Sequence, residues 1–260
     1  MFTFGNSFAQ VNISGKPGII NTPSAVATDD GLFRIGYNFN PAKYSLRPTI
    51  GMSESIFFAN ITFLKRFELN ANILRLIETK DKKRKDGIGD RQLDVRYLIL
   101  KEKKNRPSVA IILTNPFTID GALLTHALVA TKTLKIQTDL KLEMSLGYGS
   151  PYYLYRNVDN YKNSSILNGF KWQKKSTNNY KNHYLQGPFG GAILHYRKIG
   201  GLMVEYDEHL NIGMYVTVLK SWTIQAALLN GNRISFGSSY AIPLLKSSRR
   251  LKQQSDEAKK

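Results

Sequence analysis

Apolar and polar residues alternate with a period of two along most of the chain, and the alternation runs longest over residues 134–148. Even-numbered positions there are mainly Leu, Ile, Met and Tyr, whereas odd-numbered positions are mainly Lys, Gln, Asp and Glu. Successive side chains of a β-strand point to opposite faces, so the pattern predicts one continuous strand. Its 15 residues exceed the length of about 9–11 that a tilted strand needs to cross a bilayer. We therefore expect a strand that spans a membrane and projects beyond it.

Similar alternating segments recur before and after this strand. In residues 32–40, for example, Phe33, Ile35 and Tyr37 share one face and Arg34 lies on the other. None of the segments has the period of a helix. Together with 134–148 they predict about twelve strands, within the range of bacterial outer-membrane barrels. The other predicted strands are 32–40, 55–64, 67–77, 91–100, 108–114, 123–131, 190–197, 202–207, 210–219, 222–229 and 233–242.

The connections between these segments alternate in length. If the N-terminus is periplasmic, the outer connections are long in all but two cases and every inner connection is short. Outer-membrane barrels have short periplasmic turns and longer extracellular loops, whereas a soluble sandwich gives no reason for such alternation. The outer connections are 41–54, 78–90, 115–122, 149–188, 208–209 and 230–232, and the inner ones are 65–66, 101–107, 132–133, 198–201 and 220–221.

These patterns predict an all-β fold, an antiparallel transmembrane β-barrel of about 12 strands over residues 31–245. A long extracellular loop and a basic, polar C-terminal tail over 246–260 complete it. Ser7-Phe8-Ala9 has the small-x-small pattern of a signal-peptidase site, so residues 1–9 are interpreted as the end of a signal peptide. A loose N-terminal arm is the alternative interpretation. The segment 10–30 then has two expected locations, the lumen and the periplasm.

The formal charge of +18, from 37 Lys and Arg against 19 Asp and Glu, first suggests a nucleic-acid partner. The basic residues fall instead in short bursts between alternating segments, so we expect no nucleic acid. At the rims of a barrel such bursts would bind outer-membrane lipid, lipopolysaccharide phosphates or an acidic polysaccharide. Solubilising charge at loop tips is the alternative. The outer-rim candidates are Lys80, Lys82, Lys83, Arg84, Lys85, Lys171, Lys174 and Lys175.

The chain has no Cys, which excludes disulfides, thiol catalysis, Cys-based zinc sites and an acylated N-terminal Cys. No apolar run approaches the roughly 20 residues of a membrane-spanning helix. The mean hydropathy of −0.30 resembles that of a soluble protein. Because transmembrane strands alternate apolar and polar residues, such an average is equally typical of a membrane barrel.

If the apolar faces meet lipid, the polar faces line the lumen. Both signs of charge occur there, so the lumen is either filled by ion pairs or left as a narrow pore. About eight strands give a filled barrel and 16–18 leave an aqueous channel, so twelve lies between the two. The predicted lumen-facing residues are Arg34, Glu68, Asn70, Asp94, Arg96, Lys135, Asp139, Lys141, Glu143, Glu205, Asp207 and Arg233.

Catalysis has weak support in the sequence. Glu205 and Asp207 share one face of a strand and could be interpreted as a glycosidase pair, although pairing with lumenal Arg or Lys is the stronger interpretation. The four His residues lack metal-ligand spacing, and no serine-hydrolase or phosphate-binding motif occurs. We expect no enzyme, no cofactor and no metal centre.

Several short motifs, in order, resemble one known family. They are Gly18-Ile-Ile-Asn-Thr-Pro-Ser-Ala25, Gly31-Leu-Phe-Arg-Ile-Gly36, Gly89-Asp-Arg-Gln-Leu-Asp-Val-Arg96 with Leu100-Lys-Glu102 and Pro107-Ser-Val-Ala110, Leu146-Gly-Tyr-Gly149, Phe189-Gly-Gly191 and Glu205-Tyr-Asp207. The family is the YjbH-like (GfcD-like) outer-membrane proteins linked to exopolysaccharide or capsule production. The chain resembles the compact form found in Bacteroidetes-type genomes, and it lacks the Cys of the lipoprotein members.

The resemblance implies a barrel in the outer membrane of a Gram-negative bacterium. We expect it to assist exopolysaccharide or capsule export or surface assembly, as a conduit or as a docking element. The alternative is a plugged structural or accessory barrel, a subunit of a larger envelope complex without transport of its own. The expected partners are outer-membrane lipid and lipopolysaccharide, with an acidic polysaccharide and other envelope proteins as further candidates.

Overall fold

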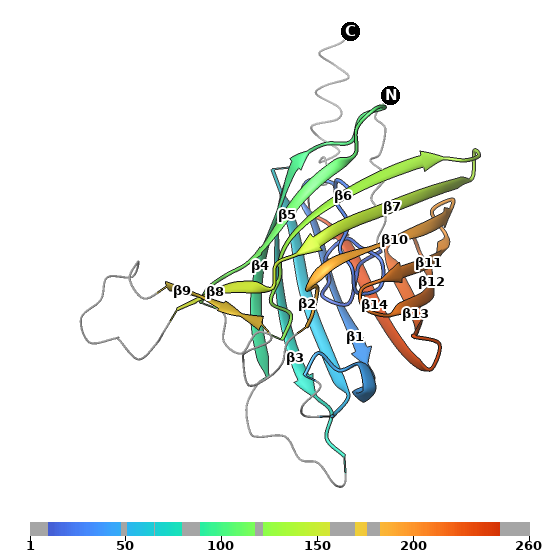
Figure 1. Cartoon of the computed structure of the whole chain (residues 1–260). Coiled ribbons are helices and arrows are strands. Elements are labelled where there is room, and N and C mark those ends of the chain that lie inside the picture. The colour runs from blue at the N-terminus through green and yellow to red at the C-terminus, as the bar shows by residue number, and fades with distance from the viewer. Residues whose placement is uncertain are drawn as a thin grey trace.

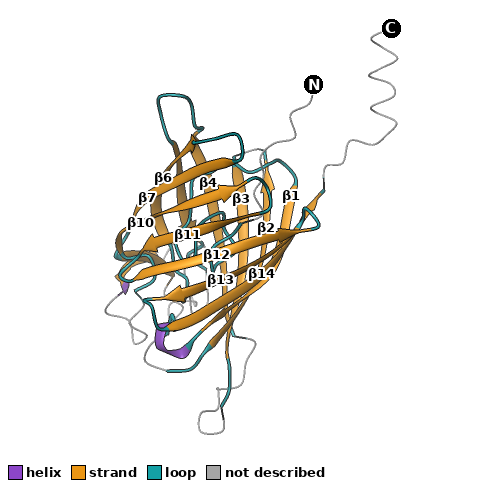
Figure 2. Cartoon of the chain, turned by 90° about the vertical axis from the view of Figure 1, so that its right-hand side faces the viewer, coloured by secondary structure: helices purple, strands orange, loops and turns teal. Residues whose placement is uncertain are grey.

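The computed structural model describes residues 10–47, 51–64, 66–79, 89–117, 122–156, 170–175 and 183–244. Within these ranges, twelve antiparallel strands form one closed barrel (Figures 1 and 2). The prediction of an all-β transmembrane barrel of about twelve strands is confirmed. The barrel strands are β1 (Leu32–Asn40), β2 (Glu54–Phe63), β3 (Phe67–Leu76), β4 (Asp90–Leu100), β5 (Ser108–Thr114), β6 (His126–Lys135), β7 (Leu140–Gly149), β10 (Gly187–Tyr196), β11 (Gly200–Tyr206), β12 (Leu210–Val218), β13 (Trp222–Leu229) and β14 (Arg233–Pro243).

Each barrel strand pairs with its neighbours in chain order, and β1 pairs with β14 to close the barrel from Leu32↔Pro243 to Phe39↔Phe236. Between β7 and β10 the chain leaves the barrel and forms a separate two-stranded sheet of β8 (Tyr152–Arg156) and β9 (Phe170–Lys174). A 3₁₀ turn, η1 (Ala42–Tyr44), follows β1. No helix among the described residues is long and apolar enough to cross a membrane. We call the end of the barrel with the long connections the outer end and the other the inner end, after the usual orientation of bacterial barrels.

The predicted continuous strand over 134–148 is wrong. The chain turns between β6 and β7 over residues 136–139, where the Ile136 N–H donates to the Leu140 carbonyl at 3.0 Å. The predicted inner turn at 132–133 lies within β6. Alternation continues through the real turn because Leu134 pairs with Leu142 and Lys135 with Lys141. Each of these pairs joins two even-numbered or two odd-numbered residues. The alternation of apolar and polar residues therefore continues across the turn unchanged.

The outer face of the barrel is apolar and its inner face is largely polar. On β7 the Leu146 side chain is 70% exposed while the neighbouring Ser145 is buried, and on β12 Met214 is 55% exposed while Tyr215 is buried. A continuous exposed apolar band of this kind is unusual for a protein surface in water and is typical of a surface that contacts lipid. The barrel is therefore a transmembrane protein.

The first described residues of the chain lie inside the barrel. We call residues 10–28 the plug; in Figure 1 this stretch forms the blue loops within the barrel. Its apolar side chains join two clusters on the barrel wall. Ile13 packs with residues of β2 to β6, and Ile19 and Ile20 pack with residues of β10 to β13. The core of the protein is thus formed between the wall and its own N-terminal segment.

The lipid-facing assignment predicts different costs for two arginine substitutions. Met214→Arg places a guanidinium on the outward face near the middle of β12, whereas Leu219→Arg, the control, places it in the turn after that strand. Arginine at the bilayer midplane costs about 2–4 kcal/mol and near the interface about 0–1 kcal/mol. We expect the free energy of unfolding to fall by these amounts in urea titrations of the protein in lipid vesicles. Equal losses for the two variants would contradict the assignment.

Candidate functional site

The plug has a compact local structure that its sequence specifies. The Asn12 side-chain oxygen accepts hydrogen bonds from the N–H groups of Ser14 and Lys16, each at 3.1 Å, and so closes a tight turn. Gly15 lies in this turn with φ of +84°, and a Cβ there would come within 2.2 Å of the Phe58 ring. The turn therefore needs glycine both for its backbone conformation and for its close approach to the barrel wall.

One carboxylate of the wall binds the outer part of the plug. Glu205 of β11 is buried, and its Oε2 accepts the backbone N–H groups of Ile20 at 3.0 Å and Thr22 at 3.0 Å. Its Oε1 accepts the N–H of Asn21 at 2.8 Å. The Thr22 hydroxyl and the Asn211 amide donate to the same carboxylate at 2.9 and 3.2 Å. Three consecutive N–H groups converging on one anion form an anion-binding nest, here occupied by a side chain of the same protein. We call this arrangement the Glu205 nest.

Two cationic side chains hold the plug on the opposite wall. Arg96 of β4 forms an ion pair with Glu68 of β3, and its Nε and Nη2 donate to the carbonyls of Ser24 at 3.1 Å and Val26 at 2.6 Å. Lys16 of the plug forms an ion pair with Asp94 of β4, and both side chains are buried. Buried charges are tolerated when they are paired and hydrogen-bonded in this way, and removing one partner is costly.

Amide and hydroxyl side chains of the wall bind further backbone groups of the plug. Asn38 of β1 donates to the Ile13 carbonyl at 2.9 Å, and Asn70 of β3 donates to the Ser14 carbonyl at 2.8 Å. The Ala25 N–H donates to Thr131 Oγ1 of β6 at 2.7 Å. A peptide segment without regular structure can be buried only if its N–H and carbonyl groups find such partners. The polar inner face of the barrel is therefore matched to this particular segment.

Most of the predicted lumen-facing residues line the plug or its surroundings. Arg34, for instance, is buried and donates to the Asn60 side chain at 3.2 Å. Lys141 and Asp207 are half-buried and lie near opposite ends of the barrel. The structure places the following predicted residues in the buried interior: Arg34, Glu68, Asn70, Asp94, Arg96, Glu143 and Glu205.

The structure does not place three other predicted residues in the lumen. Lys135 is the last residue of β6 and is exposed. Asp139 lies in the 136–139 turn and pairs with Arg197 at 3.1 Å, where both side chains are about half exposed. Arg233 begins β14 and is exposed. In the alternation of the strands, all three fall at inward-facing positions. They lie at the ends of the barrel, however, where the wall no longer encloses them.

The outer-rim candidates divide into three cases. Lys80, Lys82, Lys83, Arg84 and Lys85 lie outside the described residues. Lys171 and Lys174 are exposed on β9. Lys175 is buried instead, and its ammonium donates to the carbonyls of Leu124 at 2.7 Å and Tyr184 at 3.0 Å. Burial lowers the pKa of Lys175 to about 8, opposed by the charge of Asp94. Its assignment to the basic rim is therefore wrong, because its hydrogen-bonding capacity is directed into the protein.

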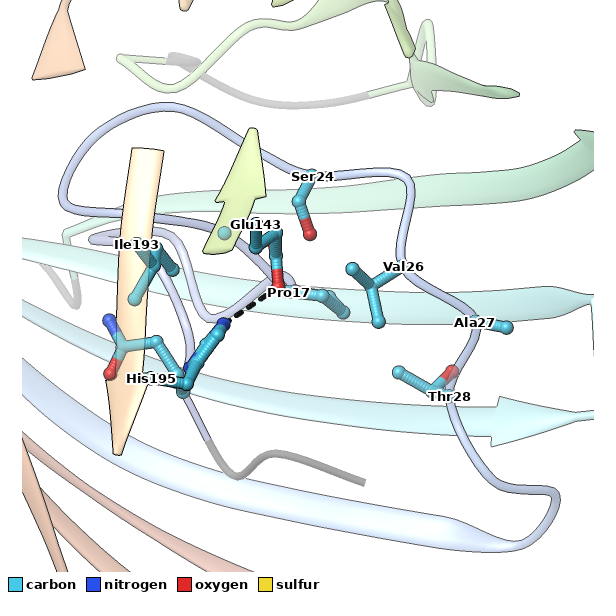
Figure 3. A pocket seen from close by; sticks show the side chains of 10 residues that line it. Pro17, Ser24, Val26, Ala27, Thr28, Glu143, Ile193 and His195 are labelled. Atoms are coloured by element: carbon cyan, nitrogen blue, oxygen red, sulfur yellow. Dashed lines mark hydrogen bonds and ion pairs between the residues drawn. The ribbon is translucent and has the colours of Figure 1, made fainter. Parts of the chain in front are cut away.

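Sequence reasoning also missed a polar network beside the plug. His195 of β10 lies 3.1 Å from the Glu143 carboxylate of β7 through Nε2 and 2.6 Å from the Tyr215 hydroxyl of β12 through Nδ1. Glu143 and His195 line a cavity of about 20 Å³. In Figure 3 they face plug residues between Pro17 and Thr28. A volume of that order holds about one water molecule. No sequence pattern signals the network, because its three residues lie on strands far apart in the chain.

A larger cleft of about 300 Å³ opens at the outer end above the plug. Its lining comes from the plug at Asn21, from Lys43 and Tyr44 after β1, from residues 183–185 before β10 and from residues 207–209 between β11 and β12. Asp207 lies in this lining, outside the strands. Burial and the nearby charge of Glu205 together raise the pKa of Asp207 to about 7, while the Asn21 side chain opposes the shift.

A closed apolar-surfaced barrel whose lumen holds its own N-terminal segment defines a plugged outer-membrane β-barrel. The chain belongs to the YjbH family: the family model described as "Exopolysaccharide biosynthesis protein YbjH" matches residues 10–260. A comparison with curated proteins finds no significant match.

Solved structures of three outer-membrane proteins are similar to the chain. The KdgM porin shares 7% identity at a TM-score of 0.44, with 82% of this chain and 99% of that chain covered. An outer membrane channel from Pseudomonas putida F1 shares 10% identity at a TM-score of 0.41, with 85% and 98% covered. The outer membrane protein Omp33 of Acinetobacter baumannii shares 6% identity at a TM-score of 0.35, with 83% and 99% covered.

The Glu205 nest predicts a local effect of removing one charge. Glu205→Gln keeps the size of the side chain but replaces the carboxylate with an amide that carries its own N–H donors. Hydrogen bonds to a charged group contribute about 1.5–3 kcal/mol, so we expect hydrogen exchange at the amides of residues 20–22 to accelerate on the order of tenfold to a hundredfold. Glu208→Gln, at an exposed position three residues further along the chain, should leave exchange there unchanged. Equal protection in the wild type and Glu205→Gln would show that the nest does not hold the plug.

The raised pKa of Asp207 predicts a pH dependence of stability. With a pKa of about 7 in the folded protein and about 3.9 when unfolded, this carboxyl binds more protons in the folded state between those values. Its contribution to the free energy of unfolding therefore falls as the pH rises from about 4 to about 7. Asp207→Asn has no carboxyl group at this position, so in urea titrations its free energy of unfolding should rise relative to that of the wild type as the pH increases across this interval. A difference independent of pH would contradict the assignment.

Proposed function

We propose that this outer-membrane protein serves exopolysaccharide export or surface assembly in a Gram-negative envelope as a docking element, with its barrel closed. Membership of an exopolysaccharide-biosynthesis family supports the process. The filled lumen supports the role: residues 10–28 occupy the space through which a polymer would pass. The single observation that carries the proposal is the attachment of this plug to the wall on both sides, through the Glu205 nest and through Arg96.

Passage of a polysaccharide through this barrel would require the plug to leave. Two cavities between the plug and the wall measure about 20 and about 10 Å³, which is space for single water molecules. Displacing the plug would expose Glu205, Arg96 and Asp94 in a lumen that is shaped around their present partners. Each hydrogen bond to a charged group contributes about 1.5–3 kcal/mol, and the contacts of Glu205 and Arg96 with the plug would be lost together. These costs favour a closed barrel that binds its partners at its surface over an open conduit.

The contacts of Glu205 on β11 support binding rather than catalysis. A glycosidase needs one carboxyl group as an acid and a second as a nucleophile or base, both facing the substrate. Both oxygens of Glu205 accept hydrogen bonds from the plug, so this residue has no access to a substrate while the plug is seated. We assign no catalytic step to the site.

The exposed cations of β9 support a contact with the membrane surface. Lys171 and Lys174 lie on the hairpin that leaves the barrel at its outer end, where lipopolysaccharide phosphates are found. Charge pairing between ammonium groups and phosphate oxygens would orient this hairpin on the outer leaflet. Lipopolysaccharide is therefore the proposed lipid partner of the hairpin.

The docking role predicts little ion conductance for the intact protein. We expect the folded wild type in planar bilayers to pass almost no potassium current, because the plug fills the lumen. A variant without residues 10–28 should conduct, since the twelve-strand wall would then enclose water. Sustained conductance by the wild type would favour the conduit over the docking element.

A chemical measurement on the intact barrel complements the recordings and does not depend on a deletion. The chain has no Cys, so single cysteines can be introduced without background. Ser24→Cys lies in the buried part of the plug, and Ala27→Cys lies at an exposed plug position nearby and serves as the control. A membrane-impermeant maleimide should label the control and spare Ser24→Cys. Rapid labelling of both would show that the plug leaves the lumen at rest.

A further inference from the structure

We infer that the outer cleft binds an uncharged, hydroxyl-rich saccharide unit and that the seated plug forms the floor of this binding site. The inference rests on the proposed role in exopolysaccharide export or assembly, and it gives that role a location and a ligand class. The cleft volume of about 300 Å³ lies at the lower end of the range of about 300–1,000 Å³ for small-molecule sites. It therefore suits a short stretch of a glycan.

The lining of the cleft matches the hydrogen-bonding groups of a sugar. Asn21 of the plug and Asn230, which follows β13, bring side-chain amides to the cleft. An amide both donates and accepts hydrogen bonds, as a sugar hydroxyl does. His209 adds a further polar group from the turn between β11 and β12. Convergence of such groups from separate elements is typical of a site that fixes the orientation of a polar ligand.

The charges of the lining favour an uncharged ligand over an acidic one. Asp207 and Glu208 contribute two carboxyl groups, whereas Lys43 contributes the one ammonium group among the described residues that line the cleft. An acidic saccharide would place its carboxylate near Asp207 and Glu208, and like charges at short range repel. The cleft therefore selects against acidic polymers, even though the whole chain carries a charge of +18.

The aromatic wall of the cleft is held in position before any ligand binds. The Tyr44 hydroxyl donates to the Asn232 side chain at 2.9 Å, which ties the loop after β1 to the turn before β14. The Tyr44 ring meets the His209 ring edge-on at a centroid distance of 5.3 Å. An aromatic ring combines an apolar face, which can cover the C–H groups of a sugar, with a polar edge. Preorganisation of this wall lowers the entropic cost of binding.

The floor of the cleft is linked to the anchor of the plug. Asn21 lines the cleft, its N–H donates to Glu205 at 2.8 Å, and its carbonyl accepts the Tyr184 hydroxyl at 3.0 Å. Asn211 donates both to Asp207 at 3.1 Å and to Glu205 at 3.2 Å. A ligand that contacts these groups binds the plugged barrel and not a barrel without its plug. By linkage, saccharide binding must stabilise the seated plug.

An oligosaccharide array tests the inference with the full chain in lipid nanodiscs. The array carries uncharged, amino-sugar and acidic oligosaccharides of two to four units. We expect retention of uncharged oligosaccharides and loss of at least tenfold in affinity with Tyr44→Ala. Tyr148→Ala, which removes an exposed tyrosine from the outward face of β7, is the matched control and should bind as the wild type does. Retention of acidic oligosaccharides alone, or binding unchanged by Tyr44→Ala, would overturn the inference.

Hydrogen exchange gives a second measurement that does not depend on a substitution. With a saturating uncharged oligosaccharide, the amides of residues 20–22 should exchange more slowly than in the free protein. Faster or unchanged exchange would contradict the linkage between cleft and plug.

Surface polymer in cells separates this inference from the proposed function. If a strain that lacks the gene still carries its surface exopolysaccharide, the proposed function itself is contradicted. If the wild-type gene restores the polymer and Tyr44→Ala restores it equally, the proposed function stands and the cleft is not its glycan site. Restoration by the wild type and by Tyr148→Ala, but not by Tyr44→Ala, is the expected result.

Discussion

The closure of the lumen by the plug depends on the contact between the Glu205 carboxylate and the three N–H groups of residues 20–22. Neither partner is stable alone in this place. A buried carboxylate without donors loses several kcal/mol of solvation, and buried N–H groups without acceptors carry a similar penalty. Each satisfies the other, so the wall and the plug stabilise one another at this contact. The turn at Asn12, the amides of β1 and β3 and the Arg96–Glu68 pair extend the same matching along the rest of the segment.

The number of strands explains why such a segment is present at all. In a barrel of about eight strands the wall's own side chains fill the interior, and with 16–18 strands water fills it. Between these limits, the twelve-strand wall of this protein encloses a space that residues 10–28 occupy. Ile13, Ile19 and Ile20 fill this space from the plug side, against apolar patches on opposite parts of the wall. The remaining contacts are polar, which explains why the inner faces carry charges of both signs.

The sequence predicts the wall well because period-two alternation reports directly on which face meets lipid. It fails at the turn between β6 and β7, where residues 134–148 keep the same parity across a change of direction. Alternation alone cannot show such a turn. The interior is predicted only in part. Arg96 and Glu205 are identified as inward-facing, but their partners in the plug are mainly backbone groups, which the side-chain pattern of a sequence does not reveal. Lys175 shows the converse, since a lysine in a basic burst directs its ammonium into the protein.

The sequence distance between the plug and its anchor has a consequence for how the barrel is made. Thr22 and Glu205 lie 183 residues apart, and the plug leads directly into β1, which forms the closing seam with β14. Contacts this remote in sequence form late, after the loop between them has been ordered. The plug reaches its final contacts only when β11 is in place, so its seating and the closure of the seam between β1 and β14 are coupled.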